Sequence, residues 1–189
     1  TTKGRFMSKV AVIYFSGYGH TKKVAEFVAD GANAQLIAID ENGDIKDTDW
    51  DALNNADAII FGAPTYMGSY PWQFKKFVDA TSKVWFTMGW KDKVFGGFTN
   101  SGSLNGDKQV TLISMQTLAS QHGGIWVSLG LPPANKLEST RQDINNLGGS
   151  VGVLVQSPTD ADESAIPSGD LETARLYGER VADVAKRLK

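Results

Sequence analysis

The chain has 189 residues, of which 41% are apolar, with 19 basic and 21 acidic side chains and a formal net charge of −2. This length and composition suffice for one domain with a substantial core, whereas two domains would be cramped. The near balance of charge disfavours nucleic-acid binding, which needs a basic face. Because the chain has no cysteine and only two histidines, disulfides, thiolate chemistry and zinc–thiolate sites are excluded, and we predict no metal site.

Residues 1–6 precede Met7 and lack the apolar core of a signal peptide. We therefore interpret them as a leader or a remnant of expression, and residues 7–189 as one domain. No apolar run approaches the length of a membrane span. The sequence predicts a soluble, cytoplasmic protein with no membrane span.

Apolar runs and helical periodicity alternate along the chain. We predict strands at residues 9–15, 34–39, 58–61, 94–98 and 125–131, and helices from 21, at 49–55, at 72–83, at 107–121 and from 168 or 170 to 188. A run at 151–155 is either a further strand or the second half of the fifth one. Residues 134–148 lack periodicity and are predicted to form a long functional or interface loop. The alternation indicates a doubly wound α/β fold, with a parallel sheet covered by helices on both faces.

The segment Ser16-Gly-Tyr-Gly-His-Thr21 joins the first strand to the first helix. The free N–H groups of the first helical turn, the positive end of the helix dipole and the hydroxyls of Ser16 and Thr21 predict an anion site here. The alternative is that one hydroxyl caps the helix and the glycines only turn the chain.

The details of this segment favour a single phosphate. Lys22 does not occupy the position of a P-loop lysine, which disfavours a nucleoside triphosphatase. The glycine fingerprint of dinucleotide-binding folds is also missing, although Asp40 at the end of the next apolar run leaves that option open.

Three loops of small and polar residues follow strands one, three and four, at residues 16–21, 64–68 and 99–106. In an open parallel sheet, ligands bind at the carboxyl ends of the strands, so these loops are predicted to form one site. The second and third loops offer backbone groups and side chains such as Thr65, Asn100 and Ser101, which suit a flat heteroaromatic ring with a polyol tail. The alternative is that they are simple turns.

Several segments together resemble the flavodoxin-like flavoproteins and, more narrowly, the WrbA-type NAD(P)H:quinone oxidoreductases. The resemblance runs through Ser16-Gly-Tyr-Gly-His-Thr21, called the phosphate loop below, Asp57-Ala-Ile-Ile-Phe-Gly-Ala-Pro-Thr65, the segment from Asp79 to Trp85, the loop from 100 to 106 and His122-Gly-Gly. It implies a five-stranded sheet of order 2-1-3-4-5 and FMN as cofactor. The cofactor-binding residues implied are Ser16, Gly17, Tyr18, Gly19, His20, Thr21, Pro64, Thr65, Tyr66, Met67, Gly68, Thr99, Asn100, Ser101, Gly102, Ser103, Leu104, Asn105 and His122.

The resemblance also implies a reaction. Tyr18 and Trp85 would wall a slot in which NADH or NADPH and a quinone stack in turn on the flavin, and His122 would approach the ring from its own or a neighbouring subunit. These three residues are the predicted catalytic residues. The structural alternatives are that Trp85 is a core residue and that His122 only donates hydrogen bonds to carbonyl groups at a helix end. The expected activity is two-electron reduction of a small-molecule quinone by a ping-pong mechanism, in a homo-oligomer that is a dimer or a tetramer.

Two other functions stay open. The first is a flavodoxin that carries electrons and has no small-molecule substrate of its own, which a strongly negative surface around the flavin would favour. The near balance of charge favours the enzyme instead. The second is a nucleotide-binding or regulator-binding module without enzymatic activity, for which no basic or helix-turn-helix segment gives support.

Overall fold

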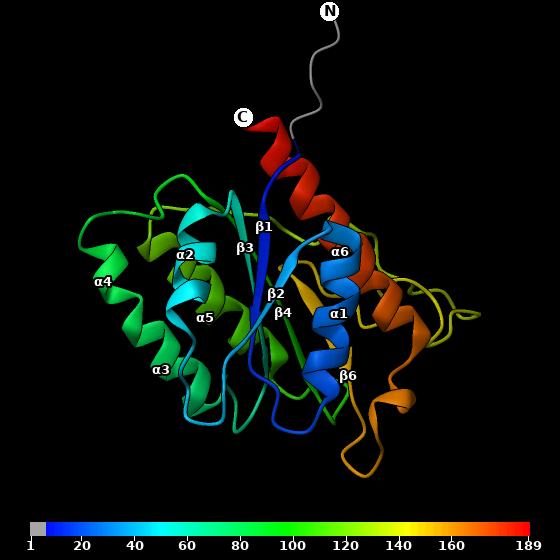
Figure 1. Ribbon diagram of the computed structural model, residues 1–189. Coiled ribbons are helices and arrows are strands. Elements are labelled where there is room, and N and C mark those ends of the chain that lie inside the picture. Colours follow the sequence, from blue (N-terminus) through cyan, green and yellow to red (C-terminus); the bar gives the residue numbers. More distant parts are fainter. Residues whose placement is uncertain (1–6) are drawn as a thin grey trace, which may run out of the picture.

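The computed structural model describes residues 7–189, so the interpretation of residues 1–6 as a leader lies outside the described residues. A parallel sheet forms the centre of the molecule (Figure 1). Its strands run in the order β2-β1-β3-β4-β5, with β6 also paired to β4. The predicted α/β fold and sheet order are therefore confirmed. The strands are β1 Val10–Tyr14, β2 Gln35–Ala38, β3 Ala58–Pro64, β4 Val94–Ser101, β5 Ile125–Trp126 and β6 Val153–Gln156.

The fifth position of the sheet is divided between two strands. The first part of β4 pairs with β5, through Val94 with Ile125 and Phe95 with Trp126. The second part pairs with β6, beginning with Phe98 and Val153. Among residues 7–189 the predicted five positions therefore hold six strands, and the run near 151–155 is the second half of the fifth strand. Residues 127–152 are an excursion between the two halves.

Helices cover both faces of the sheet, as predicted (Figure 1). On one face α1 packs against α6 so closely that two glycines are required. A Cβ on Gly31 would lie 1.9 Å from the Arg175 carbonyl oxygen, and one on Gly178 would lie 2.1 Å from that of Val28. The other face carries α2 to α5. The helices are α1 His20–Ala32, α2 Asp47–Asn55, α3 Trp72–Ala80, α4 Ser82–Trp85, α5 Lys108–Gln121 and α6 Ser168–Arg187, with a short 3₁₀ turn at Glu163–Ala165.

The hydrophobic core has two parts, one on each side of the sheet. Val12 and Ile60 point toward α1 and α6, whereas Ile13 and Ile59 point toward α2, α3 and α5. All four side chains are fully buried. This is the pattern of strands covered on both faces, for which near-continuous apolar runs are typical. Within residues 7–189, no helix is both long enough and apolar enough to cross a membrane.

The irregular segment from 134 to 148 packs against its own chain. The N–H of Asn145 donates to the Thr173 hydroxyl at 2.8 Å, and the Arg141 guanidinium lies 2.6 Å from the Asp170 carboxylate, both partners belonging to α6. The prediction of a long loop is therefore correct, but its use in closing the site of a neighbouring subunit finds no support in these contacts. The homo-oligomer stays a prediction.

Candidate functional site

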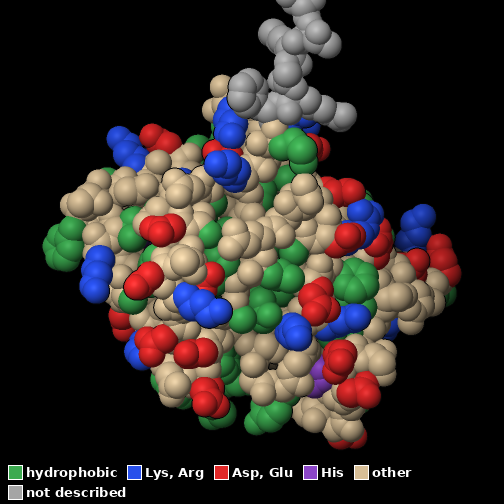
Figure 2. Space-filling view, viewed as in Figure 1, with side chains coloured by type: hydrophobic (Ala, Val, Ile, Leu, Met, Phe, Trp, Pro, Cys, Tyr) green, Lys and Arg blue, Asp and Glu red, His purple; other side chains and the backbone are tan. Residues whose placement is uncertain are grey.

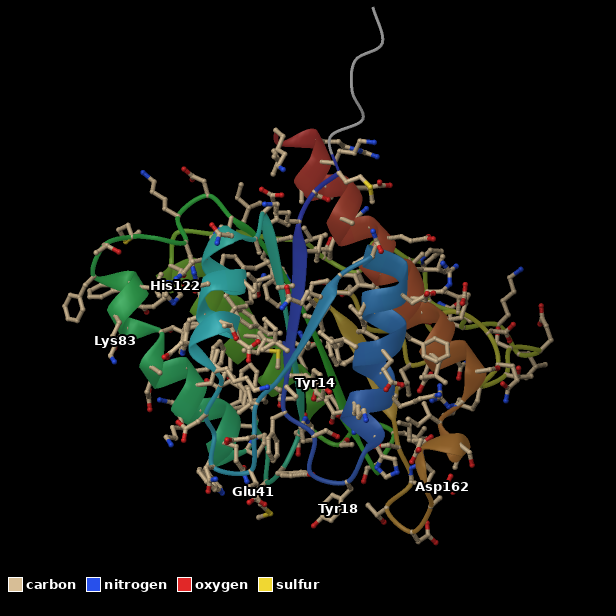
Figure 3. All side chains as sticks on the ribbon, viewed as in Figure 1. Tyr14, Tyr18, Glu41, Lys83, His122 and Asp162 are labelled. Atoms are coloured by element: carbon tan, nitrogen blue, oxygen red, sulfur yellow. The ribbon has the colours of Figure 1, made fainter. Side chains whose placement is uncertain are left out.

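The three predicted loops meet around a cavity of about 770 Å³ at the carboxyl ends of the strands. In Figure 3, Tyr18 and Asp162 mark this end of the molecule. Because the loops leave three adjacent parallel strands, they reach the same edge of the sheet. The residues that line the cavity are Tyr18, His20, Thr21, Thr65, Tyr66, Asn100, Ser101, Gly102, Ser157, Thr159, Asp160, Ala161 and Asp162.

The first loop is organised by the hydroxyl of Ser16. Its Oγ accepts hydrogen bonds from the N–H groups of Gly19 and Lys22, both at 3.1 Å. Gly19 has a φ of 96°, in the left-handed region that favours glycine, and it leads directly into α1. The N–H groups of residues 17, 18, 20 and 21 have no partner among residues 7–189. Free donors at the positive end of a helix are the elements of a phosphate site.

Hydrogen bonds between buried side chains join the first loop to the third. Thr21, which is 2% exposed, donates its hydroxyl proton to Asn100 Oδ1 at 2.6 Å. Asn100 in turn donates from Nδ2 to Ser157 Oγ at 2.9 Å. The expectation that the Thr21 hydroxyl donates to a phosphate is therefore corrected, because that proton is already used. The backbone N–H of Thr21 stays available.

The second loop is fixed to the third in a similar way. The hydroxyl of Thr65 lies 2.8 Å from that of Thr99 and 2.7 Å from that of Thr111, and its N–H donates to the Asn100 carbonyl at 2.9 Å. Beyond Pro64 and Thr65 the loop turns through Met67 and Gly68, both with positive φ. These hydrogen bonds join the two loops at the floor of the cavity, whereas the buried Ser101 Oγ has no partner among residues 7–189.

The rim of the site carries exposed apolar and aromatic side chains. Tyr18 is 82% exposed, and its ring centroid lies 6.4 Å from that of Tyr66 at an angle of 63°. Met67 and Leu104 are also exposed. Burial raises the pKa of Tyr66, with a smaller contribution from Tyr18. A planar ring could lie against these side chains while the phosphate loop holds its other end.

A fourth wall of the cavity, residues 157–162, was missed by the sequence reasoning. The Ser157 N–H donates to the Ser101 carbonyl at 2.9 Å, and His20 Nε2 donates to the Ala161 carbonyl at 2.8 Å. The segment directly follows β6, which is parallel to β4. The signal that could have found it was the apolar run at 151–155, because any parallel strand delivers the residues after it to the same edge.

His122 lies at the opposite end of the sheet (Figure 3). It follows α5 and precedes β5, at the amino ends of the strands. The ring is 1% exposed, its Nε2 is 2.9 Å from Thr81 Oγ1 and its centroid is 4.7 Å from that of Trp90. Burial lowers its pKa. The structure therefore does not bring His122 to the cavity, and a side chain enclosed in its own subunit is not presented to a neighbour's site either.

Trp85 is also placed away from the cavity. It ends α4, which follows α3, and α3 returns from the carboxyl to the amino ends of the strands. Of the three predicted catalytic residues, the structure brings only Tyr18 to the cavity. The reason is topological: a residue after a helix in this fold lies at the edge where the next strand begins.

Comparison with known proteins identifies the family. A family model described as a flavodoxin domain matches residues 11–88. A protein of Pseudomonas aeruginosa strain UCBPP-PA14 named flavodoxin FldP is 69% identical over 182 residues, which cover 96% of this chain and 99% of that protein. The chain belongs to the flavodoxin family.

Solved structures agree with this flavodoxin assignment. A flavodoxin described as a WrbA-like protein from Agrobacterium tumefaciens is 53% identical and superposes with a TM-score of 0.81, covering 96% of this chain and 99% of that one. A flavodoxin from the domain Archaea is 22% identical with a TM-score of 0.62, covering 94% and 99% of the two chains, and shows the fold alone. The predicted flavodoxin-like family is thus confirmed, whereas the narrower WrbA-type assignment is not.

The predicted function requires a correction. The near-full-length relative at 69% identity is a flavodoxin, so the expectation of an NAD(P)H:quinone oxidoreductase is wrong. The comparisons likewise give no support for NADH or NADPH as co-substrate. The structure agrees with the correction, because Trp85 and His122, which were to complete the substrate slot, lie outside the cavity. The FMN prediction is supported, since the flavodoxin domain implies that cofactor.

Proposed function

We propose that this flavodoxin binds FMN and carries electrons between partner proteins. The single observation that carries the proposal is the 69% identity to a flavodoxin over 96% of this chain. The phosphate loop, with four N–H groups that lack partners among residues 7–189, agrees with it. The residues of the cavity fit the cofactor in kind. They provide an anion site for the phosphate, polar side chains for the ribityl chain and aromatic side chains for the ring of FMN.

Each part of the site has a separate task in this proposal. Ser16 shapes the phosphate loop and offers its own hydroxyl proton to the anion, since Ser16 Oγ only accepts bonds within the chain. The network of Thr21 and Asn100 holds the loops at a fixed separation. Tyr18 and Tyr66 cover the ring and keep water from part of it. When bound, FMN itself supplies the electron transfer.

The rim suits a protein partner better than an enclosed substrate. Tyr18 and Met67 project from the surface, so the edge of the site is open to a docking protein. Acidic side chains gather at this end, namely Asp160, Asp162 and Glu163 beside the cavity, with Glu41 in an adjoining hollow next to Tyr18 (Figures 2 and 3). The near balance of charge over the whole chain concealed this local excess. A negative rim favours association with a partner that has a basic face.

The choice of flavin tests the first half of the proposal. Apoprotein should be titrated with FMN, FAD and riboflavin, with flavin fluorescence as the signal. FMN should bind most tightly, because the loop is built for one terminal phosphate and riboflavin has none. Charge-assisted hydrogen bonds contribute about 1.5–3 kcal/mol each, so riboflavin should bind at least about tenfold more weakly. Equal affinity for FMN and riboflavin would show that the loop does not hold the phosphate.

A further inference from the structure

Lys108 is a buried cation directly behind the third loop. It is the first residue of α5 and is 1% exposed. Its ammonium donates to three successive backbone carbonyls of the loop, those of Ser103, Leu104 at 3.1 Å and Asn105 at 3.4 Å. The same loop supplies Ser101 and Gly102 to the wall of the cavity. A single side chain thus sets the direction of the loop's carbonyl groups.

This position is electrostatically unfavourable for a lysine. The beginning of a helix is the positive end of its dipole, which repels a cation. Within residues 7–189 no carboxylate forms an ion pair with Lys108, and the Asp170 carboxylate is paired with Arg141 at 2.6 Å. Burial lowers the pKa of Lys108 to about 8, an effect that Asp170 opposes and Arg141 reinforces. The three charges together leave the region behind the loop with a net positive charge at neutral pH.

A buried positive charge has a specific consequence beside a redox cofactor. A reduced flavin carries more negative charge than an oxidised one, and charges interact more strongly in a protein interior than in water. We propose that Lys108 is a positioning residue that holds the third loop in its binding shape and also favours the reduced form of the bound flavin. The proposal rests on the proposed FMN site.

The chain offers a matched control in Lys93. Its Nζ also donates to backbone carbonyls, those of Asn54 at 2.8 Å and of Ala56, and burial also lowers its pKa. Lys93 immediately precedes β4, however, so it lies at the amino ends of the strands, away from the cavity. Loss of a lysine that binds backbone carbonyls can therefore be compared on the two sides of β4, at the buried Lys108 behind the site and at the partly buried Lys93 away from it.

The test compares Lys108→Met with Lys93→Met in three measurements: the dissociation constant of oxidised FMN, the midpoint potential of the bound flavin and amide hydrogen exchange of residues 101–106 in the apoprotein. For Lys108→Met we expect faster amide exchange in the loop. We also expect the protein's preference for reduced over oxidised flavin to fall about tenfold, which lowers the midpoint potential by about 59 mV for one electron. Lys93→Met should change neither. An unchanged potential, or an equal shift in both variants, would overturn the electrostatic role, and unchanged exchange would overturn the positioning role.

Asp170→Asn provides a second variant in case Lys108→Met does not fold. It removes the negative charge that raises the pKa of Lys108, so both variants are measured at pH 6, where Lys108 keeps its proton. The potential of Asp170→Asn should then shift upward, opposite to the Lys108 variant. Loss of contacts alone gives no reason for the two variants to shift the potential in opposite directions, and an unchanged or lowered potential in Asp170→Asn would overturn the electrostatic role. Failure of the wild-type apoprotein to bind FMN would instead refute the proposed function, and hydrogen exchange of the loop would still test the positioning role.

Discussion

At the scale of single residues, several polar side chains of the site form hydrogen bonds that fix the shape of its loops. Ser16 accepts two N–H groups of its own loop, and Thr21 is committed to Asn100. The sequence showed which residues gather at the site, because small and hydroxyl residues follow three buried strands. It did not show which hydroxyl keeps a free proton, because that depends on contacts between loops far apart in the chain.

Ser16→Ala should weaken FMN binding by about tenfold or somewhat more, since one charge-assisted bond to the phosphate and the shape of the loop are both lost. Thr21→Ala acts only through Asn100 and should cost less. Titration of the two apoproteins measures the difference, with Ser114→Ala on the outer side of α5 as control. Equal losses at Ser16 and Thr21 would contradict the distinction that the structure draws.

His122 should behave as a structural residue. Burial lowers its pKa below 6.5 in the folded protein, so folding disfavours its protonated form. The neutral ring therefore contributes stability that is fully present above pH 6.5. That stability is lost as the pH falls from 6.5 toward the lowered pKa of the folded protein, at a rate of at most about 1.4 kcal/mol per pH unit. Urea unfolding of wild type and His122→Gln between pH 5 and 8 measures this effect. The free energy of unfolding should fall more steeply with decreasing pH in wild type than in the variant. A change in FMN affinity in His122→Gln would contradict a purely structural role.

At the scale of elements, the main departure from the sequence analysis is the divided fifth strand. The alternation of strands and helices predicted the order of the sheet, because short connections and right-handed crossovers leave few alternatives. The run at 151–155 was recognised, but its pairing with β4 brings Ser157 to Asp162 into the site, and that pairing joins segments far apart in the sequence. The periodicity within one segment does not show with which distant segment it pairs.

Beyond Ser157, the 157–162 segment is joined to the phosphate loop by one hydrogen bond. His20 Nε2 donates to the Ala161 carbonyl, so His20→Ala should release the segment. Amide hydrogen exchange of residues 158–163 should become faster, and FMN should dissociate faster because one wall of its site is loosened. Asp30→Ala, at the exposed far end of the same helix, is the control. Unaltered exchange in His20→Ala would show that the Ser157 contacts alone hold the segment.

At the scale of the whole molecule, overall composition was a poor guide to function. A net charge of −2 suggested a neutral surface, yet Asp160, Asp162 and Glu163 stand together beside the cavity. The resemblance in the three loops predicted the fold and the cofactor, because those loops bind the flavin. It misjudged the activity, because Trp85 at the end of α4 and His122 after α5 do not line the cavity, and a flavin bound there is out of their reach.

Neutralising the acidic rim should slow association with a basic redox partner. The variant Asp160→Asn/Asp162→Asn/Glu163→Gln should be reduced more slowly by such a partner at low ionic strength, and the difference from wild type should shrink as salt screens the charges. Stopped-flow absorbance at several salt concentrations measures both rates. A deficit that persists unchanged in high salt would point to a structural effect of the substitutions.

The most direct test of the electron-carrier account is anaerobic reduction of the FMN-loaded protein, followed by flavin absorbance. NADH or NADPH alone should leave the flavin oxidised over seconds, whereas a catalytic amount of an NADPH-dependent flavodoxin reductase should reduce it rapidly. Rapid bleaching by either nicotinamide without the reductase, with colour restored by a benzoquinone, would contradict the account.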